Sequence, residues 1–134
     1  MNHRAKTLFA AAMLAAALLP CLREAVAAPL TTTTLAVTNG STAVAAVTSG
    51  TVVTLTAAVV KSGTTAVVTP GLVRFCDSAL NAYCQGSALL GTAQLNAKGI
   101  AVLKLRLGLG THTITAVFAG KKTEGGSTSA AKLL

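Results

Sequence analysis

The stretch IAVLKLRLGLGTHTITAVFA at residues 100–119 decides the fold class. In its first half, Lys104 and Arg106 alternate with aliphatic residues, and in its second half an aliphatic or aromatic residue returns at every second position. A period of two places alternate side chains on opposite faces of a β-strand. The stretch therefore predicts two strands, at 100–107 and 111–119, each with one apolar and one polar face.

Working outward, the same pattern recurs between clusters of Gly, Ser and Asn. The further predicted strands are Thr33–Thr38, Thr51–Val60, Leu72–Asp77, Leu90–Leu95 and a weaker one at Ser127–Leu133. The residues predicted to face inward are Leu35, Val37, Val53, Leu55, Ala57, Val59, Val73, Phe75, Ala93, Leu95, Ala101, Leu103, Leu105, Leu107, Ile114, Ala116 and Phe118. The connections expected to supply positive φ are Asn39-Gly40, Ser62-Gly63, Lys98-Gly99 and Gly125-Gly126. Seven short antiparallel strands with one apolar face each predict an all-β sandwich, because two sheets must stack to bury those faces.

The N-terminal residues 1–27 are predicted to be a secretory signal peptide. Arg4 and Lys6 precede an unbroken apolar run of 12 residues, Leu8–Leu19. Small residues follow at Ala25-Val26-Ala27, which is the pattern that signal peptidase cleaves. The expected cleavage follows Ala27, because cleavage one residue later would leave Pro29 in first position.

Two other interpretations of this segment fit the sequence less well. A membrane anchor is disfavoured because the apolar run is shorter than the roughly 20 residues that span a bilayer. Leu18-Leu19-Pro20-Cys21 loosely resembles a lipoprotein motif, but Pro20 stands where a small, flexible residue is usual. After cleavage at Ala27 there is no expected membrane span.

The charge is strongly basic, with 11 Lys+Arg against 3 Asp+Glu and a formal net charge of +8. Removal of residues 1–27 leaves eight basic residues and only Asp77 and Glu124 as acids, for a net charge of +6. Such a surface could attract a polyanion, although no aromatic residues lie among the basic ones to stack on bases. We therefore expect no nucleic-acid partner. We expect instead that the basic residues keep the edges of the sheets soluble.

The predicted strands resemble the Ig-like repeats of secreted and cell-surface bacterial proteins. The segments that carry the resemblance are TTTTLAV at 31–37, GTVVTLTAAV at 50–59, GLVRF at 71–75, LGTAQLNAKGIAVL at 90–103 and GTHTITAVFAG at 110–120. The most specific spacing is that of Gly110, His112, Ala116, Phe118 and Gly120. The resemblance implies an Ig-like β-sandwich domain over residues 31–134. The sequence differs from antibody-type domains because it has no tryptophan and no cysteine pair that would join the second and sixth strands.

The resemblance implies a non-catalytic role. We expect an exported structural or adhesion module, either a spacer or a display unit, that is periplasmic, secreted or held at the cell surface. The alternatives are a binding module for an envelope glycan or partner protein, through one tip formed by 79–85 and 121–126, and an accessory domain of a larger secreted protein. Expected partners are other Ig-like repeats, surface proteins or envelope polysaccharide. The chain is expected to be either a minimal module or a fragment of a longer architecture.

Cys76 and Cys84 are expected to form a disulfide. An even pair of cysteines in an exported chain indicates a disulfide, here closing a short loop after the third strand. A zinc site using both thiolates and His112 would have only three candidate ligands where four are usual. A redox motif would have two intervening residues rather than seven. No metal and no cofactor are expected.

Asp77 and His112 are predicted to meet at one end of the sandwich. Asp77 ends the third strand, His112 opens the sixth, and these strands are expected to be antiparallel neighbours. With a serine the pair would contain the ingredients of a hydrolase triad. No G-x-S-x-G motif occurs, and Glu124 lies too far along the chain to form a carboxylate pair with Asp77. We expect no catalytic residues. We expect Asp77 and His112 to form a polar pair that hydrogen-bonds to the backbone groups of the loops.

Overall fold

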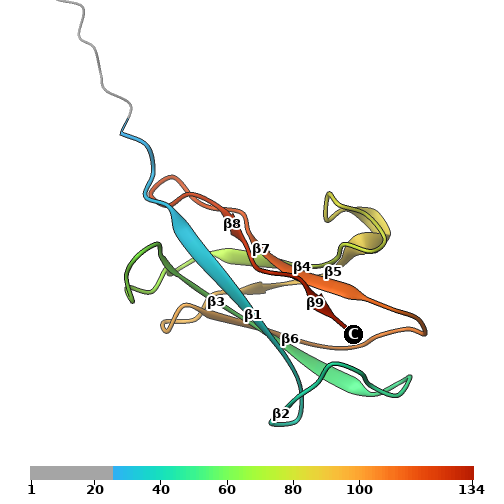
Figure 1. Cartoon of the computed structure of the whole chain (residues 1–134). Helices are drawn as coiled ribbons and strands as arrows, with labels where there is room; N and C mark the ends of the chain where they lie inside the picture. The colour runs from blue at the N-terminus through green and yellow to red at the C-terminus, as the bar shows by residue number, and fades with distance from the viewer. Residues whose placement is uncertain (1–25) are drawn as a thin grey trace, which may run out of the picture.

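The computed structural model describes residues 26–134 as two antiparallel sheets packed face to face (Figure 1). The strands are β1 (Thr31–Asn39), β2 (Thr42–Ala43), β3 (Val52–Lys61), β4 (Leu72–Asp77), β5 (Leu89–Gln94), β6 (Ile100–Arg106), β7 (Thr113–Phe118), β8 (Ser127–Thr128) and β9 (Lys132–Leu133). A 3-10 turn, η1 (Gly86–Ala88), precedes β5. One sheet has the order β2-β1-β3-β6 and the other β5-β4-β7-β8, with β9 also pairing with β7. The predicted all-β sandwich is confirmed.

The predicted signal peptide lies almost wholly outside the described residues. Of its 27 residues, only Val26 and Ala27 are described, and both are exposed. Within 26–134 no helix has the length and apolar character needed to cross a membrane.

The core forms where the apolar faces of the two sheets meet. In β3, Val53, Leu55 and Ala57 are fully buried, and across the sheet they pair with Leu105, Leu103 and Ala101 of β6. In the facing sheet, Phe75 and Phe118 are the largest buried side chains. Each fully buried Val, Leu, Ile or Phe side chain stabilises the fold by about 1.5–3 kcal/mol. The alternation in the sequence thus identifies the core.

Three of the predicted inward residues are only half-buried. Ala93 lies on β5, and Leu103 and Leu105 lie on β6. These strands end the two sheets, so each has a neighbouring strand on one side only. Side chains on such strands face the core, but a neighbouring strand covers them on one side only, so they stay partly exposed.

The last predicted strand, Ser127–Leu133, is not continuous, and this prediction is corrected. Ser129 is buried, and its backbone N–H donates to the Ala116 carbonyl at 2.8 Å. Its hydroxyl oxygen accepts the Ala116 N–H at 3.0 Å, in the place of a backbone carbonyl. The side chain therefore interrupts the ladder, and the segment splits into β8 and β9.

The expectation for Gly125-Gly126 is also wrong, because neither glycine has positive φ. The turn uses Gly120 instead, with φ +78°. At Gly126 the requirement is space, since a Cβ there would lie 2.8 Å from the Phe118 carbonyl oxygen. The other three predicted connections do have glycines at positive φ, at Gly40, Gly63 and Gly99.

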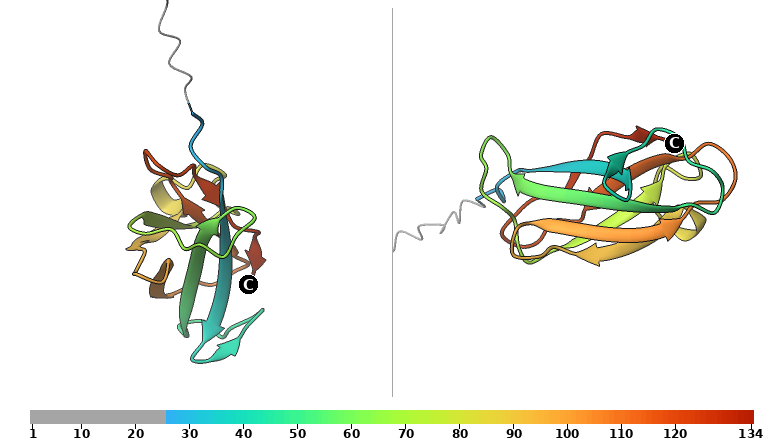
Figure 2. Two further views of the ribbon diagram at one scale, coloured as in Figure 1. Left: turned by 90° about the vertical axis from the view of Figure 1, so that its left-hand side faces the viewer. Right: turned by 90° about the horizontal axis from the view of Figure 1, so that it is seen from below.

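The two ends of the described chain lie at opposite ends of the sandwich. Figure 2 shows the N-terminal segment leaving one end and the C-terminus at the other. The entering chain is bonded at Pro29, whose carbonyl accepts the Gly125 N–H at 2.9 Å. At the far end, Leu134 and His112 exchange two backbone hydrogen bonds, each of 2.9 Å. The long axis of the domain therefore separates its entry from its exit.

Candidate functional site

The structure places Asp77 and His112 in direct contact at the C-terminal end of the sandwich. Asp77 is the last residue of β4 and is 1% exposed, and His112 immediately precedes β7. The Nδ1 of His112 lies 2.6 Å from the Oδ2 of Asp77. The other carboxylate oxygen accepts two backbone N–H groups, those of Ala79 at 3.1 Å and Thr113 at 3.0 Å. Antiparallel pairing of β4 with β7 brings these segments together.

The hydrogen bonds hold His112 as the imidazolium. Its Nε2 lies 3.1 Å from the Gly108 carbonyl oxygen, which can only accept a hydrogen bond. Because an ionised carboxylate also only accepts, both ring nitrogens must carry a proton. Accordingly, the bond to Asp77, followed by the bond to Gly108, raises the pKa of His112 above 6.5. Burial tends to raise the pKa of Asp77, but the hydrogen bonds from His112, Thr113 and Ala79 outweigh it and lower that pKa below 3.8.

A doubly donating imidazolium has no free lone pair with which to act as a general base. His112 borders a shallow depression of about 220 Å³ that Ser49 also lines. In a hydrolase triad the second ring nitrogen would face the nucleophile, but here it is bonded to a backbone carbonyl. The pair is therefore arranged to stabilise a loop and a strand end.

The pair makes stability depend on pH in a defined direction. The raised pKa of His112 means that its contribution is complete below pH 6.5 and is lost as pH rises through the folded-state pKa. The lowered pKa of Asp77 means that its contribution is present above pH 3.8 and is lost as pH falls through the folded-state pKa. The pair therefore stabilises the fold most between these two values.

Asp77→Asn is expected to reduce the free energy of unfolding near pH 5.5 by about 1.5–3 kcal/mol, because a charged hydrogen bond is lost. The same change should bring the pKa of His112 down towards 6.5, as measured by NMR titration of the ring protons. Glu124→Gln, at the opposite end of the domain, is the control and should leave the titration of His112 unchanged. A wild-type His112 that titrates below 6.5 would contradict the imidazolium assignment.

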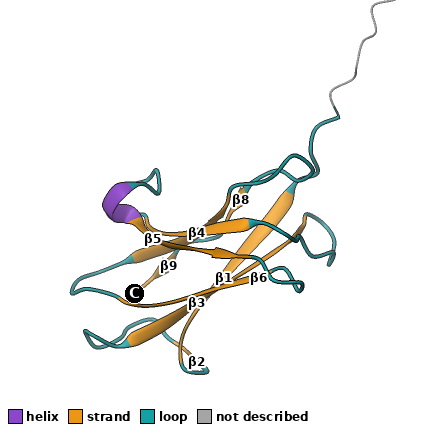
Figure 3. Cartoon of the chain, turned by 180° about the vertical axis from the view of Figure 1, so that it is seen from behind, coloured by secondary structure: helices purple, strands orange, loops and turns teal. Residues whose placement is uncertain are grey.

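The predicted cysteine pair is joined in the structure. Cys76 and Cys84 form a disulfide with a Cα–Cα distance of 5.2 Å. Both sulfurs are thus committed to this bond, and His112 to Asp77, so these three residues do not form a metal site. Figure 3 shows the resulting loop and η1 projecting beside β4 and β5.

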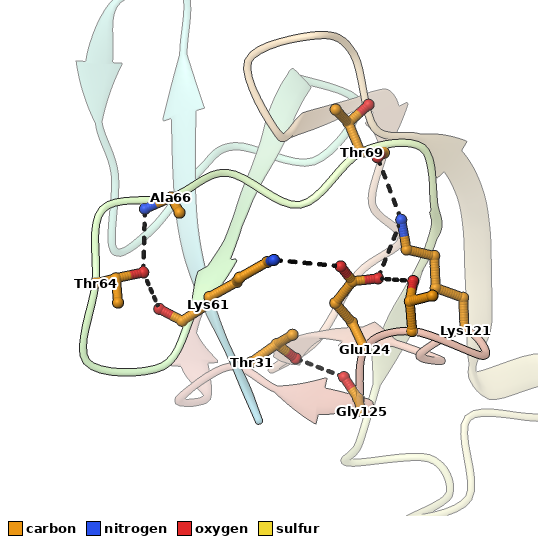
Figure 4. Close-up of polar contacts among 9 residues, drawn as sticks. Thr31, Lys61, Thr64, Ala66, Thr69, Lys121, Glu124 and Gly125 are labelled. Atoms are coloured by element: carbon orange, nitrogen blue, oxygen red, sulfur yellow. Dashed lines mark hydrogen bonds and ion pairs between the residues drawn. The ribbon is translucent and has the colours of Figure 1, made fainter. Parts of the chain in front are cut away.

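A second polar cluster lies at the N-terminal end of the sandwich (Figure 4). Lys61 and Lys121 both point at Glu124, with Nζ–carboxylate distances of 3.7 Å and 3.1 Å. The ammonium group of Lys121 also donates to the Thr69 carbonyl at 3.2 Å. The Thr123 hydroxyl, and then Lys121 and Lys61, lower the pKa of Glu124. The cluster ties the end of β3 and the β3–β4 connection to the β7–β8 connection, and sequence patterns gave no sign of Lys61 as a member.

Hydroxyl groups join the two sheets beside this cluster. The Thr31 hydroxyl lies 2.7 Å from the Gly125 carbonyl oxygen and 2.8 Å from the Ser127 hydroxyl. Thr33 lies 2.6 Å from the same Ser127 hydroxyl. Thr31 and Thr33 are buried, and β1 begins at Thr31, which pairs with Lys61, two residues earlier than the sequence pattern predicts.

The expected single binding tip is not formed. The loop 79–85 follows Asp77 at the C-terminal end, whereas 121–126 lies with Lys61 and Thr31 at the N-terminal end. Asp77 and Glu124 are likewise at opposite ends, so they do not face one cleft. Because β4 and β7 are antiparallel, the loops that follow them leave the sheet at opposite ends of the sandwich.

Basic residues occupy exposed positions of the first sheet. Lys104 and Arg106 point outward from the edge strand β6. Charged side chains on an edge strand discourage pairing with another chain. The outward placement of Lys104 and Arg106 that the alternation in 100–107 predicts is confirmed.

Two stacked antiparallel sheets with these crossovers define an immunoglobulin-like sandwich. A family model described as bacterial Ig-like domain (group 3) matches residues 37–133, and the chain belongs to that family. Comparison with curated proteins and comparison with solved structures each gave no match. Domains of this family are generally non-enzymatic and typically extracellular or at the surface, which suggests a non-catalytic structural module.

Proposed function

We propose that this chain is an exported, non-catalytic spacer or display module of the bacterial cell surface. The observation that carries the proposal is the placement of Pro29 and Leu134, which are bonded into opposite ends of the sandwich. After cleavage this geometry would keep a partner docked at the N-terminal end of the domain apart, by the full length of the sandwich, from a partner held at the C-terminal end. Its natural partners would be other Ig-like repeats or surface proteins.

Export is supported by two features. The residues preceding the domain have the layout of a signal peptide, with cleavage after Ala27. The Cys76–Cys84 disulfide fits an oxidising compartment, because disulfides are rare where thiols are kept reduced.

Intact-mass measurement tests the export step. In cells that express the full chain, the protein from the periplasm, surface or medium is expected to begin at Ala28. Replacing both Ala25 and Ala27 by leucine should block processing and retain the uncleaved chain. The conservative pair Ala25→Gly and Ala27→Ser is the control and should still be cleaved. A full-length, unprocessed wild-type protein found only in the cytosol would refute the proposal.

Surface display is tested on intact cells. An antibody against the domain, or a protease added outside, should reach the protein without cell lysis. Protein reached only after the envelope is opened would instead favour a periplasmic module.

A further inference from the structure

The outer face of the second sheet carries a groove that the sandwich architecture does not require. Arg74 of β4, Thr115 and Val117 of β7 and Thr128 of β8 form its floor. These residues alternate with the buried Phe75, Ala116 and Phe118, so they point away from the core. The groove has a volume of about 310 Å³, which is at the low end for small-molecule sites.

The loop 78–85 forms the wall of this groove. Cys76 also points outward from β4, yet it is only 1% exposed because Cys84 and the loop cover it. The disulfide therefore fastens the loop over the face of the sheet. Cys84 itself has a positive φ of 51°, a conformation that few residues other than glycine adopt.

Further hydrogen bonds fix the loop. Both the backbone N–H and the hydroxyl of Ser78 donate to the Thr113 carbonyl, at 2.8 Å and 2.9 Å. The side chain of Asn81 accepts the Tyr83 N–H at 2.8 Å. A wall held in this way is preorganised, so little ordering entropy would be lost on binding.

The groove presents donors that have no partner within the described residues. The ion pairs formed in 26–134 involve Lys61, Lys121 and His112, and none involves Arg74. Within residues 26–134, the hydroxyl groups of Thr115 and Thr128 make no hydrogen bond. Tyr83 is exposed, with 81% of its surface accessible. A lone guanidinium, two hydroxyls and an exposed aromatic ring therefore converge on one small groove.

We propose that this groove binds a uronic acid residue of an acidic polysaccharide. The planar fork of Arg74 matches a carboxylate, to which it can donate two parallel hydrogen bonds. The threonine hydroxyls and the Asn81 amide pair with sugar hydroxyls, and the Tyr83 ring packs against the C–H face of the sugar. A carboxylate-bearing peptide is less well matched, because it lacks the ring of hydroxyl groups that Thr115, Thr128 and Asn81 can bond beside Arg74.

Titration with a tetramer of galacturonic acid at low ionic strength tests the proposal. Chemical shifts of the groove residues are expected to move, with Arg74→Gln weakening binding about tenfold or more. Tyr83→Ala should also weaken binding while leaving the thermal midpoint almost unchanged. The matched control is Arg106→Gln, which removes the same charge from the other sheet and should alter affinity less than about twofold.

Three outcomes would overturn the proposal. Equal losses in Arg74→Gln and Arg106→Gln would show nonspecific attraction to a basic surface. Equal binding of the methyl-esterified tetramer would remove the role of the carboxylate. Tighter binding of short peptides with a free C-terminal carboxylate, or no binding of the tetramer at all, would exclude an acidic sugar as the ligand. None of these results bears on export or on the spacer geometry.

Discussion

Replacing Phe118 by alanine is expected to lower the free energy of unfolding by about 3–5 kcal/mol. Phe118 is 1% exposed, and with Phe75 it supplies the only aromatic rings in the core of residues 26–134. Gly71 is shaped around it, since a Cβ there would lie 2.6 Å from the Phe118 ring. Phe118 belongs to a core cluster with residues of both sheets, so the cavity left by alanine is expected to close only in part.

Chemical denaturation monitored by circular dichroism measures this loss. Because a domain of this size is stable by only about 5–15 kcal/mol, the variant should unfold at much lower denaturant concentration. Tyr83→Ala is the matched control, because it removes an aromatic ring from an exposed position and should change stability by less than about 0.5 kcal/mol. Similar losses in the two variants would mean that Phe118 is not in the core.

Removing the disulfide with the double variant Cys76→Ala and Cys84→Ala is expected to cost about 2–3 kcal/mol. The bond closes a short loop, with a sequence separation of 8, and restricts the unfolded chain accordingly. For a domain of about 100 residues this corresponds to a fall of roughly 10–20 °C in the melting temperature.

The loss should be accompanied by local loosening rather than by a change of fold. Hydrogen exchange is expected to speed up at 78–85 and to remain slow in β3 and β7. Wild-type protein treated with a reductant is the control and should melt with the double variant. A variant as stable as the oxidised protein would show that the other contacts of the loop already hold it.

The sandwich was predictable because each strand repeats one local rule. In 52–61 and 113–118 every second side chain is apolar, and these are the residues that the structure buries. The contact between Asp77 and His112 follows from the same parity, because their two strands are antiparallel neighbours. Local alternation thus predicts both the core residues and the contact between Asp77 and His112.

Other features depend on packing between distant segments and have no local pattern. Val68 lies in a connection without alternation, yet it is 1% exposed and donates its N–H to the Val59 carbonyl at 3.0 Å. Ser129 looks like an ordinary strand residue, and only its place opposite Ala116 makes its hydroxyl interrupt the ladder. The groove around Arg74 likewise needs the loop to fold back over β4, which the cysteine spacing permits but does not specify.

The opposite placement of the two ends bears on how the domain would carry tension. A pull exerted by partners bound at these two ends would run along the strands, so the ladder bonds of a terminal strand would be strained together rather than opened one after another. β1 pairs with β3 at eight positions, whereas β8 and β9 pair with β7 at four in all. The C-terminal ladder is also interrupted at Ser129, so it is expected to yield under load before the continuous ladder between β1 and β3.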